Sequence, residues 1–232
     1  MNSLPHSLLS TVHFKMGDLE IDLQGEKLLL LPERVLYWPA RQTLVIADPH
    51  LGKAAAFRAA AIPVPGGTTT ANLERLAAAI GRTGARRLIC LGDLLHARSG
   101  RAPQIVAAVA AWREQHGHLD FWLVRGNHDR HAGEPPAEWR VQCFDGPVVE
   151  APFVWRHFPE AEAAGYTIAG HVHPAVRLGR GELGETLPCF FFGESVGILP
   201  AFGDFTGTMV LRPQSGNRVY VLADNEVIYV SV

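Results

Sequence analysis

Aspartate, asparagine and histidine residues gather in five short clusters along this chain, and each cluster follows directly after an apolar run. In chain order the clusters are Asp48 with His50, Asp93 with His96, Asn127 with His128 and Asp129, His157 alone, and His171 with His173. Imidazole, carboxylate and carboxamide groups are ligands for borderline divalent metals, and no cysteine joins them. If the five clusters meet in space, these residue types indicate a metal centre.

Each cluster taken alone has a simpler explanation. Asp48 lies before Pro49, which is typical of a turn, and Asp93 suits the N-cap of a helix that begins at Leu94. The segment "GNHD" is rich in turn-forming residues, and "GHVH" fits an exposed strand end. The clusters share one chemistry, however, and a common site explains all five at once.

The apolar runs before the clusters predict five β-strands, at residues 43–48, 86–93, 120–127, 152–157 and 166–171. Two amphipathic helices are predicted between the first three strands. One begins within 68–70 and ends at Gly81 or Gly84, and the other runs from Pro103 to Gly117. This alternation predicts parallel crossovers, and ligands of such sheets gather beyond the carboxyl ends of the strands. We therefore expect the clusters to converge.

After Gly133 the helical pattern fades, and strands with hairpins are expected. The segment "GRGELG" at 179–184 matches a dinucleotide-binding pattern formally, but Pro188 follows too soon for a helix, so a hairpin connection is expected.

Composition favours an ordinary globular protein with one domain spanning residues 1–232. The chain is 47% hydrophobic and 19% charged, its formal net charge is −2, and it shows no repeat or low-complexity linker. Three widely spaced cysteines argue against a disulfide framework and favour a reducing, cytoplasmic setting. No signal-peptide pattern and no run of about 18 apolar residues occur, so no membrane association is expected.

The motifs "DPH", "GD", "GNHD", a single histidine and "GHVH", in that order, resemble the signature of the calcineurin-like metallophosphoesterases. The resemblance implies a four-layer α/β/β/α sandwich that holds two divalent ions, most simply Mn²⁺, with Fe or Zn²⁺ as alternatives. It assigns Asp48, His50 and His173 to one ion, Asn127, His157 and His171 to the other, and Asp93 to both. His157 lacks a distinctive motif, and a core histidine is the alternative there.

The resemblance also implies a mechanism, in which a metal-bridging hydroxide attacks phosphorus. His128 is expected to protonate the leaving oxygen, while Asp129 either orients His128 or closes the turn. Gly92, Gly126 and Gly170 precede ligand groups, where we expect the backbone to turn sharply. If residues 170–173 continued as a regular strand, His171 and His173 would point to one face.

The segment "GDLLH" is similar to the "GDLFH" of one family of nucleases, which places His96 on the substrate side rather than among the ligands. The segments "ADPHLGKAAAFRAAAIPVPGG", "GHVHPA" and "PAFGDFTG" are similar to the bacterial metallophosphoesterases associated with the Lhr helicase and a DNA ligase. That resemblance implies an endonuclease that cleaves single-stranded or unpaired DNA during repair. A small-molecule phosphodiesterase or nucleotidase and a catalytically inactive scaffold are the alternatives.

Basic residues near the motif loops are candidates for phosphate contacts, because phosphates attract lysine and arginine whatever the base sequence. Lys53, Arg58 and Arg125 are the expected substrate-binding residues.

Overall fold

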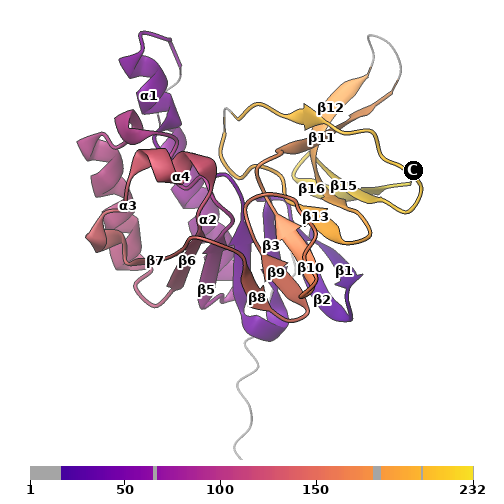
Figure 1. The fold of residues 1–232 in the computed structure, drawn as a ribbon. Helices are drawn as coiled ribbons and strands as arrows, with labels where there is room; N and C mark the ends of the chain where they lie inside the picture. The colour runs from indigo at the N-terminus through magenta and orange to yellow at the C-terminus, as the bar shows by residue number, and fades with distance from the viewer. Residues whose placement is uncertain (1–16, 65–66, 180–183, 205, 232) are drawn as a thin grey trace, which may run out of the picture.

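The computed structural model describes residues 17–64, 67–179, 184–204 and 206–231. Two β-sheets lie face to face, and helices cover the outer side of the first sheet (Figure 1). The predicted α/β class and the pair of stacked sheets are confirmed.

The first sheet has seven strands in chain order. They are β1 (Leu19–Leu23), β2 (Glu26–Leu31), β3 (Val35–Trp38), β4 (Thr43–Ile46), β5 (Arg87–Cys90), β6 (Asp120–Val124) and β7 (Val141–Phe144). Strands β1 to β4 pair antiparallel, whereas β4 to β7 pair parallel through crossovers. The three strands predicted here are confirmed, but each ends before its polar cluster because those residues leave the ladder.

Helices α1 (Lys53–Ala59), α2 (Thr68–Thr83), α3 (Pro103–Gln115) and α4 (Asn127–Ala132) precede the second sheet in the chain, as do short 3-10 helices at Pro39–Arg41, Arg98–Gly100 and Ala137–Trp139. Helix α2 buries Leu73, Leu76 and Ile80 on one face and ends at Gly84, whose φ is 65°. Helix α3 starts with a proline, where the missing N–H has no helical partner to lose. Both predicted helices are confirmed, whereas α1 and α4 have no counterpart among the predictions.

The second sheet is built from the second half of the chain. Its strands are β8 (Val148–Glu150), β9 (Phe153–Trp155), β10 (Tyr166–Ala169), β11 (Pro174–Leu178), β12 (Glu185–Phe192), β13 (Val196–Ile198), β14 (Met209–Val210), β15 (Arg218–Ala223) and β16 (Glu226–Val230). Its order is β14-β11-β12-β13-β10-β9-β8, with β15 joining β12 to β16. Among the residues that the structure describes after Trp139 there is no helix, so the described helices all lie on the side of the first sheet.

Strands β11 and β12 pair antiparallel, with Leu178 opposite Glu185. The "GRGELG" segment therefore joins two hairpin strands, as expected, although residues 180–183 themselves lie outside the described residues.

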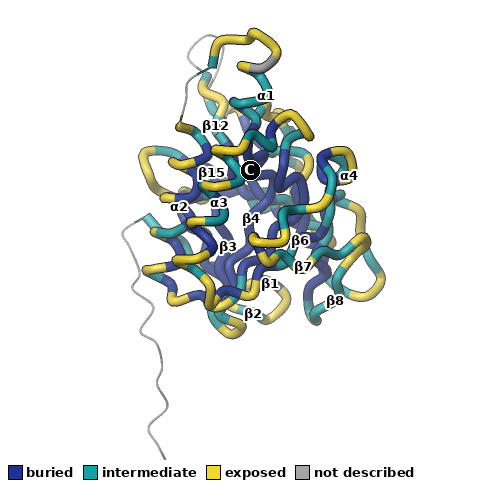
Figure 2. The backbone as a smooth tube through the Cα atoms, turned by 90° about the vertical axis from the view of Figure 1, so that its left-hand side faces the viewer, coloured by how far each residue is buried: buried dark blue, intermediate teal, exposed yellow. Residues whose placement is uncertain are grey.

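Two hydrophobic cores hold the layers together, and strand alternation divides the side chains between them. Leu44 and Ile46 of β4 pack under the helices, while Val45 and Ala47 face the second sheet. Trp38 meets Phe153 across the sheets at a ring-centroid distance of 5.1 Å. In Figure 2 the central strands β3 and β4 are dark blue, which marks them as buried. This packing fixes the strand ends that carry the polar clusters.

None of the described helices is long and apolar enough to cross a bilayer.

Candidate metal centre

The polar clusters lie at the carboxyl ends of parallel strands from both sheets. Asp48, Asp93 and Asn127 follow β4, β5 and β6, which are parallel neighbours in the first sheet. His157 and His171 follow β9 and β10, which are parallel neighbours in the second sheet. The structure brings the five loops together, as the strand order predicts.

The seven expected ligands form two adjacent groups. In the first, Asp48, His50 and His173 place their ligand atoms within 4.8 Å of one another, and His173 Nε2 lies 3.5 Å from Asp48 Oδ1. In the second, Asp93, His157 and His171 do the same. Asn127 joins the second group, because its Oδ1 lies 3.1 Å from His157 Nε2.

Asp93 lies between the two groups. One of its oxygens, Oδ2, lies 3.9 Å from His50 Nε2, and the other, Oδ1, lies 3.7 Å from His157 Nε2. A carboxylate with one oxygen directed at each group is placed to be shared by two cations. No helix begins at Leu94, so the helix-cap explanation of Asp93 is wrong.

Lone pairs that converge on one point show that this arrangement fits cations. His157 Nδ1–H donates to Leu91 O at 2.9 Å, so its Nε2 lone pair faces Asn127 Oδ1, itself an acceptor, at 3.1 Å and His171 Nδ1 at 3.0 Å. His173 Nδ1–H likewise donates to Gly207 O at 2.8 Å and turns its Nε2 toward Asp48. Two acceptors that face each other repel unless a cation lies between them.

A buried atom without a partner gives the same indication. Asp48 Oδ1 is buried and has no hydrogen-bond partner among the described residues. Buried polar atoms are nearly always hydrogen-bonded, so each such exception needs an explanation, and an ion is one. The donor set of imidazole nitrogen and carboxylate or amide oxygen suits Mn²⁺, Fe or Zn²⁺.

Backbone strain is concentrated in the ligand loops. Five of the expected ligands have φ between 44° and 69°, namely Asp48, His50, Asp93, His171 and His173. A left-handed non-glycine residue costs about 1–3 kcal/mol and tends to persist where function requires it. The condition under which His171 and His173 would share one face is not met, because β10 ends at Ala169, and the two side chains enter different groups.

Glycine is required at three positions beside the ligands mainly because a ligand side chain lies close to its Cα. A Cβ on Gly92 would lie 2.2 Å from His157 Nδ1, one on Gly126 would lie 2.2 Å from Asp93 Oδ1, and one on Gly170 would lie 2.6 Å from Asp48 Oδ2. Only Gly92, with φ of 84°, has the left-handed backbone of a sharp turn. The expected sharp turn of the backbone therefore occurs at Gly92, whereas Gly126 and Gly170 are needed because they leave room for a ligand side chain.

Asp129 ties the ligand loops together. Its Oδ2 accepts hydrogen bonds from the N–H groups of Asp93 at 2.7 Å and Gly126 at 2.9 Å, and its Oδ1 accepts one from Leu95 at 3.3 Å. Burial raises the pKa of this carboxyl even though three N–H donors oppose the shift. Of the two roles considered for Asp129, its hydrogen bonds within the described chain support closing the turn, not orienting the His128 ring.

Comparison with solved structures finds the nuclease MPE of Pseudomonas putida, which is 43% identical with a TM-score of 0.82, over 92% of this chain and 100% of that one. The chain belongs to this metallophosphoesterase family. It is therefore a metal-dependent phosphoesterase, a hydrolase of phosphate esters. A phosphoesterase of Escherichia coli, YfcE, matches at 16% identity with a TM-score of 0.40, over 81% of this chain and 97% of that one. A scan against protein-family models and a search of curated proteins both give no match.

Two further histidines of this metallophosphoesterase lie against the ligand groups. His128 Nδ1–H donates to His96 O at 2.7 Å, which directs Nε2 toward Asp93 Oδ2 at 4.0 Å. The His96 ring stacks on His128 with centroids 5.0 Å apart. Burial and the Lys53 charge lower the pKa of His96 to about 4, so this imidazole is neutral at pH 7. With His50, the two rings form a third group whose nitrogens lie within 4.8 Å of one another.

The three expected phosphate contacts have different environments. Lys53 is the first residue of α1. Burial lowers the pKa of its ammonium group, whereas attraction to the Asp93 and Asp48 carboxylates raises it. The same attraction means that the Lys53 charge acts on the metal centre. Arg58 is exposed on α1 beside a hollow of about 180 Å³ at the start of α2. Arg125 differs from both, because Glu134 and Asp145 pair with its guanidinium.

The Arg125 side chain is also only 10% exposed, so we assign it to the support of the Asn127 loop and not to phosphate binding. No sequence motif indicates this pairing, because neither Glu134 nor Asp145 belongs to a recognisable motif.

The sequence also missed the backbone groups that orient the ligands. Leu91 O and Gly207 O fix the ring nitrogens of His157 and His173. Gly207 belongs to the "PAFGDFTG" segment, so a sequence signal existed, but the segment was not connected with the metal centre.

Proposed function

We propose that the protein is a two-metal phosphodiesterase that cleaves DNA internally, in single-stranded or unpaired regions. The observation that carries this proposal is the placement of Asp93 between two groups of nitrogen and oxygen ligands. Sites of this kind hold the attacking and leaving oxygens of a phosphoester on a pair of ions.

In this proposal Asp48, His50 and His173 hold one ion, Asn127, His157 and His171 hold the other, and Asp93 contacts both. When bound, two divalent ions lower the pKa of water and neutralise charge on the phosphoryl oxygens. We propose Mn²⁺ as the usual metal, with Fe or Zn²⁺ as alternatives, since nitrogen and oxygen ligands suit all three.

His128 acts as the general acid. Its Nδ1–H is committed to His96 O, so the proton that it delivers to the leaving oxygen is carried on Nε2, the nitrogen on the Asp93 side. The ring is 38% exposed, which lets it exchange that proton with solvent. His96, stacked on His128, contacts the substrate and holds the diester in place.

Three observations support DNA as the substrate. The relative with 43% identity is a nuclease, the "GDLLH" segment resembles that of nucleases, and Lys53 and Arg58 lie on α1 at the edge of the site. Phosphate contacts of this kind bind a strand without reading its sequence.

The resemblance to helicase- and ligase-associated enzymes suggests a role in DNA repair alongside a helicase and a ligase. We place the protein in the cytoplasm, because all three cysteines are free, as suits a reducing compartment.

Substrate profiling of the Mn²⁺-loaded protein tests this proposal. Bis(p-nitrophenyl) phosphate, its monoester, nucleotides, linear duplex DNA and circular single-stranded DNA are compared, with Asp93→Asn as the inactive control. We expect the circular single strand to be cut, because only an endonuclease opens a circle. Turnover of nucleotides with an intact circle would instead establish a nucleotidase. No bound metal by elemental analysis and no activity on any substrate would establish an inactive scaffold.

A further inference from the structure

A second pocket lies directly behind His173, on the side away from the metal groups. Its volume is about 200 Å³, and its lining includes Arg34, Pro174, Pro188, Asp204, Thr206 and Thr208. The His173 ring separates pocket and site, since Nε2 faces Asp48 while Nδ1–H donates to Gly207 O, between two of the lining threonines. The pocket and the metal groups therefore lie on opposite sides of one imidazole ring.

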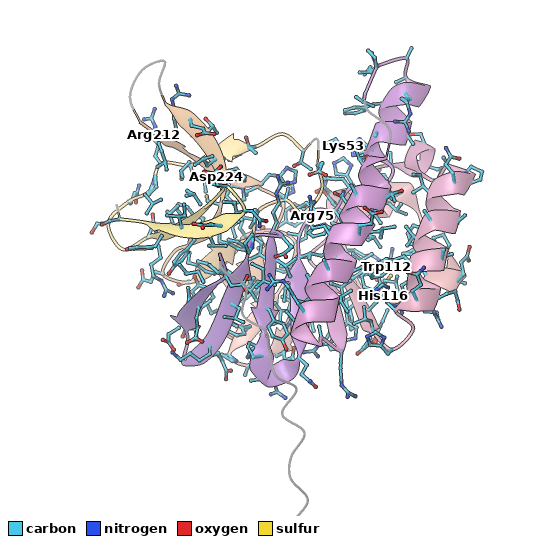
Figure 3. All side chains as sticks on the ribbon, turned by 180° about the vertical axis from the view of Figure 1, so that it is seen from behind. Lys53, Arg75, Trp112, His116, Arg212 and Asp224 are labelled. Carbon is cyan, nitrogen blue, oxygen red and sulfur yellow. The ribbon has the colours of Figure 1, made fainter. Side chains whose placement is uncertain are left out.

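The charge beside the pocket is positive. Arg34 Nη1 lies 3.6 Å from Asp204 Oδ1, and Arg75 Nη1 lies 3.3 Å from the same oxygen. Two guanidinium groups share one carboxylate, which leaves an excess of one positive charge. Burial and repulsion from Arg75 lower the pKa of Arg34 more than Asp204 raises it, in line with that excess. Figure 3 shows Arg75 on the side of α2 that faces the second sheet.

Arg34 has unused donors. Its contacts with the described residues all use Nη1, which reaches Ala201 O at 3.4 Å, Gly203 O at 3.5 Å and Asp204. Nε and Nη2 are left for a ligand, and this edge of a guanidinium matches two phosphate oxygens.

The backbone at Arg34 is strained for a residue with a side chain. The residue lies in the turn between β2 and β3 with φ of 65°, a conformation in which glycine would avoid the strain. An arginine at such a position indicates that its side chain is needed there.

We propose that this pocket is a subsite for the sugar–phosphate unit next to the scissile phosphate, an inference that rests on the proposed cleavage of DNA. Arg34 and the Thr208 hydroxyl bind the neighbouring phosphate, and Pro174 with Pro188 provides an apolar wall for the sugar. The pocket is smaller than the roughly 300 Å³ at which pockets for whole ligands begin, so it takes this fragment of the strand and not a nucleotide with its base.

The test compares a small diester with a single strand. Bis(p-nitrophenyl) phosphate has no second phosphate, whereas an oligonucleotide fills both positions. We expect Arg34→Gln to lower kcat/KM on the oligonucleotide about tenfold more than on the small diester. The slope of log(kcat/KM) against log salt should become shallower by about 0.7, the value for one lost phosphate contact on a single strand.

Asp204→Asn should act in the opposite direction, because it removes the negative charge and leaves both guanidiniums, so KM for the oligonucleotide should fall. Lys27→Gln is the matched control, since this exposed lysine on β2 contacts only Asp22 and Glu20 among the described residues. We expect that variant to behave as wild type on both substrates.

The outcomes are distinguishable. If wild type hydrolyses the small diester but not the oligonucleotide, the proposed function itself fails. The subsite is overturned if wild type cuts the oligonucleotide and Arg34→Gln affects both substrates equally. It is also overturned if Arg34→Gln and Asp204→Asn weaken DNA cleavage alike. Should Arg34→Gln not fold, the exposed Thr208→Val replaces it. We then expect KM for the oligonucleotide to rise about threefold, as for one lost hydrogen bond, and an unchanged KM overturns the subsite.

Discussion

Replacing Gly126 by alanine should disable the metal centre with a single added methyl group. The backbone at Gly126, with φ of −94° and ψ of −177°, is extended and suits alanine, so no backbone strain is introduced. The new Cβ, however, would lie 2.2 Å from Asp93 Oδ1 and 2.8 Å from both Asp93 N and His157 Cε1. An ordinary contact begins near 3.4 Å, so the carboxylate must move by about 1.2 Å, the difference between 3.4 and 2.2 Å.

That displacement is large on the scale of catalysis. A reacting group misplaced by about 1 Å loses roughly 100-fold in rate. The Asp93 carboxylate also accepts a hydrogen bond from His128 N–H at 3.0 Å, and this bond is lost as the oxygen moves. We therefore expect kcat on bis(p-nitrophenyl) phosphate to fall at least about 100-fold. Because Asp93 faces both ligand groups, the bound metal should fall below two ions per chain.

Overpacking of a buried site typically costs about 1–3 kcal/mol, which corresponds to roughly 2–4 °C in Tm for each kcal/mol in a chain of this length. Gly146→Ala is the matched control, because a Cβ at that position meets nothing within 4 Å. Steady-state kinetics, elemental analysis and thermal denaturation of both variants provide the measurements. A Gly126→Ala enzyme with full kcat and two bound ions would refute the argument from close approach.

Three further perturbations test other parts of the site. His96→Ala should retain two ions by elemental analysis while the diester rate falls about 100-fold. Loss of an ion would instead show that His96 is a metal ligand, held in the third histidine group. Asp129→Asn should lower the stability of the metal-free protein by about 2–3 kcal/mol, because two charge-assisted hydrogen bonds weaken and Leu95 N–H loses its acceptor. An unchanged Tm would contradict that role. At pH 8 a thiol reagent should label half-buried Cys143 well before Cys189, since burial raises the Cys189 pKa to about 12 and keeps it protonated. Equal labelling rates in the native protein would exclude this, and labelling in urea provides the control.

The sequence by itself determined the strands, the main helices and the edge of the sheet where the polar residues gather. Local patterns can be recognised without knowledge of the fold. Two examples are the apolar run "TLVIAD" and the helical spacing of Leu73, Leu76 and Ile80. The ligand types were visible for the same reason, since each cluster directly follows its strand.

Only the tertiary structure decided how those residues are arranged and used. His171 N–H donates to Asp48 Oδ2 across 123 positions of sequence, and left-handed φ values send His171 and His173 to different groups. Periodicity cannot predict either, because it assumes a regular backbone. Arg125 turned out to be paired with Glu134 and Asp145, and Arg34 lies beside a pocket formed by segments 139 or more positions away. Contacts between distant segments decide which basic side chain faces the substrate and which one supports a loop. These contacts form only when the two sheets pack together.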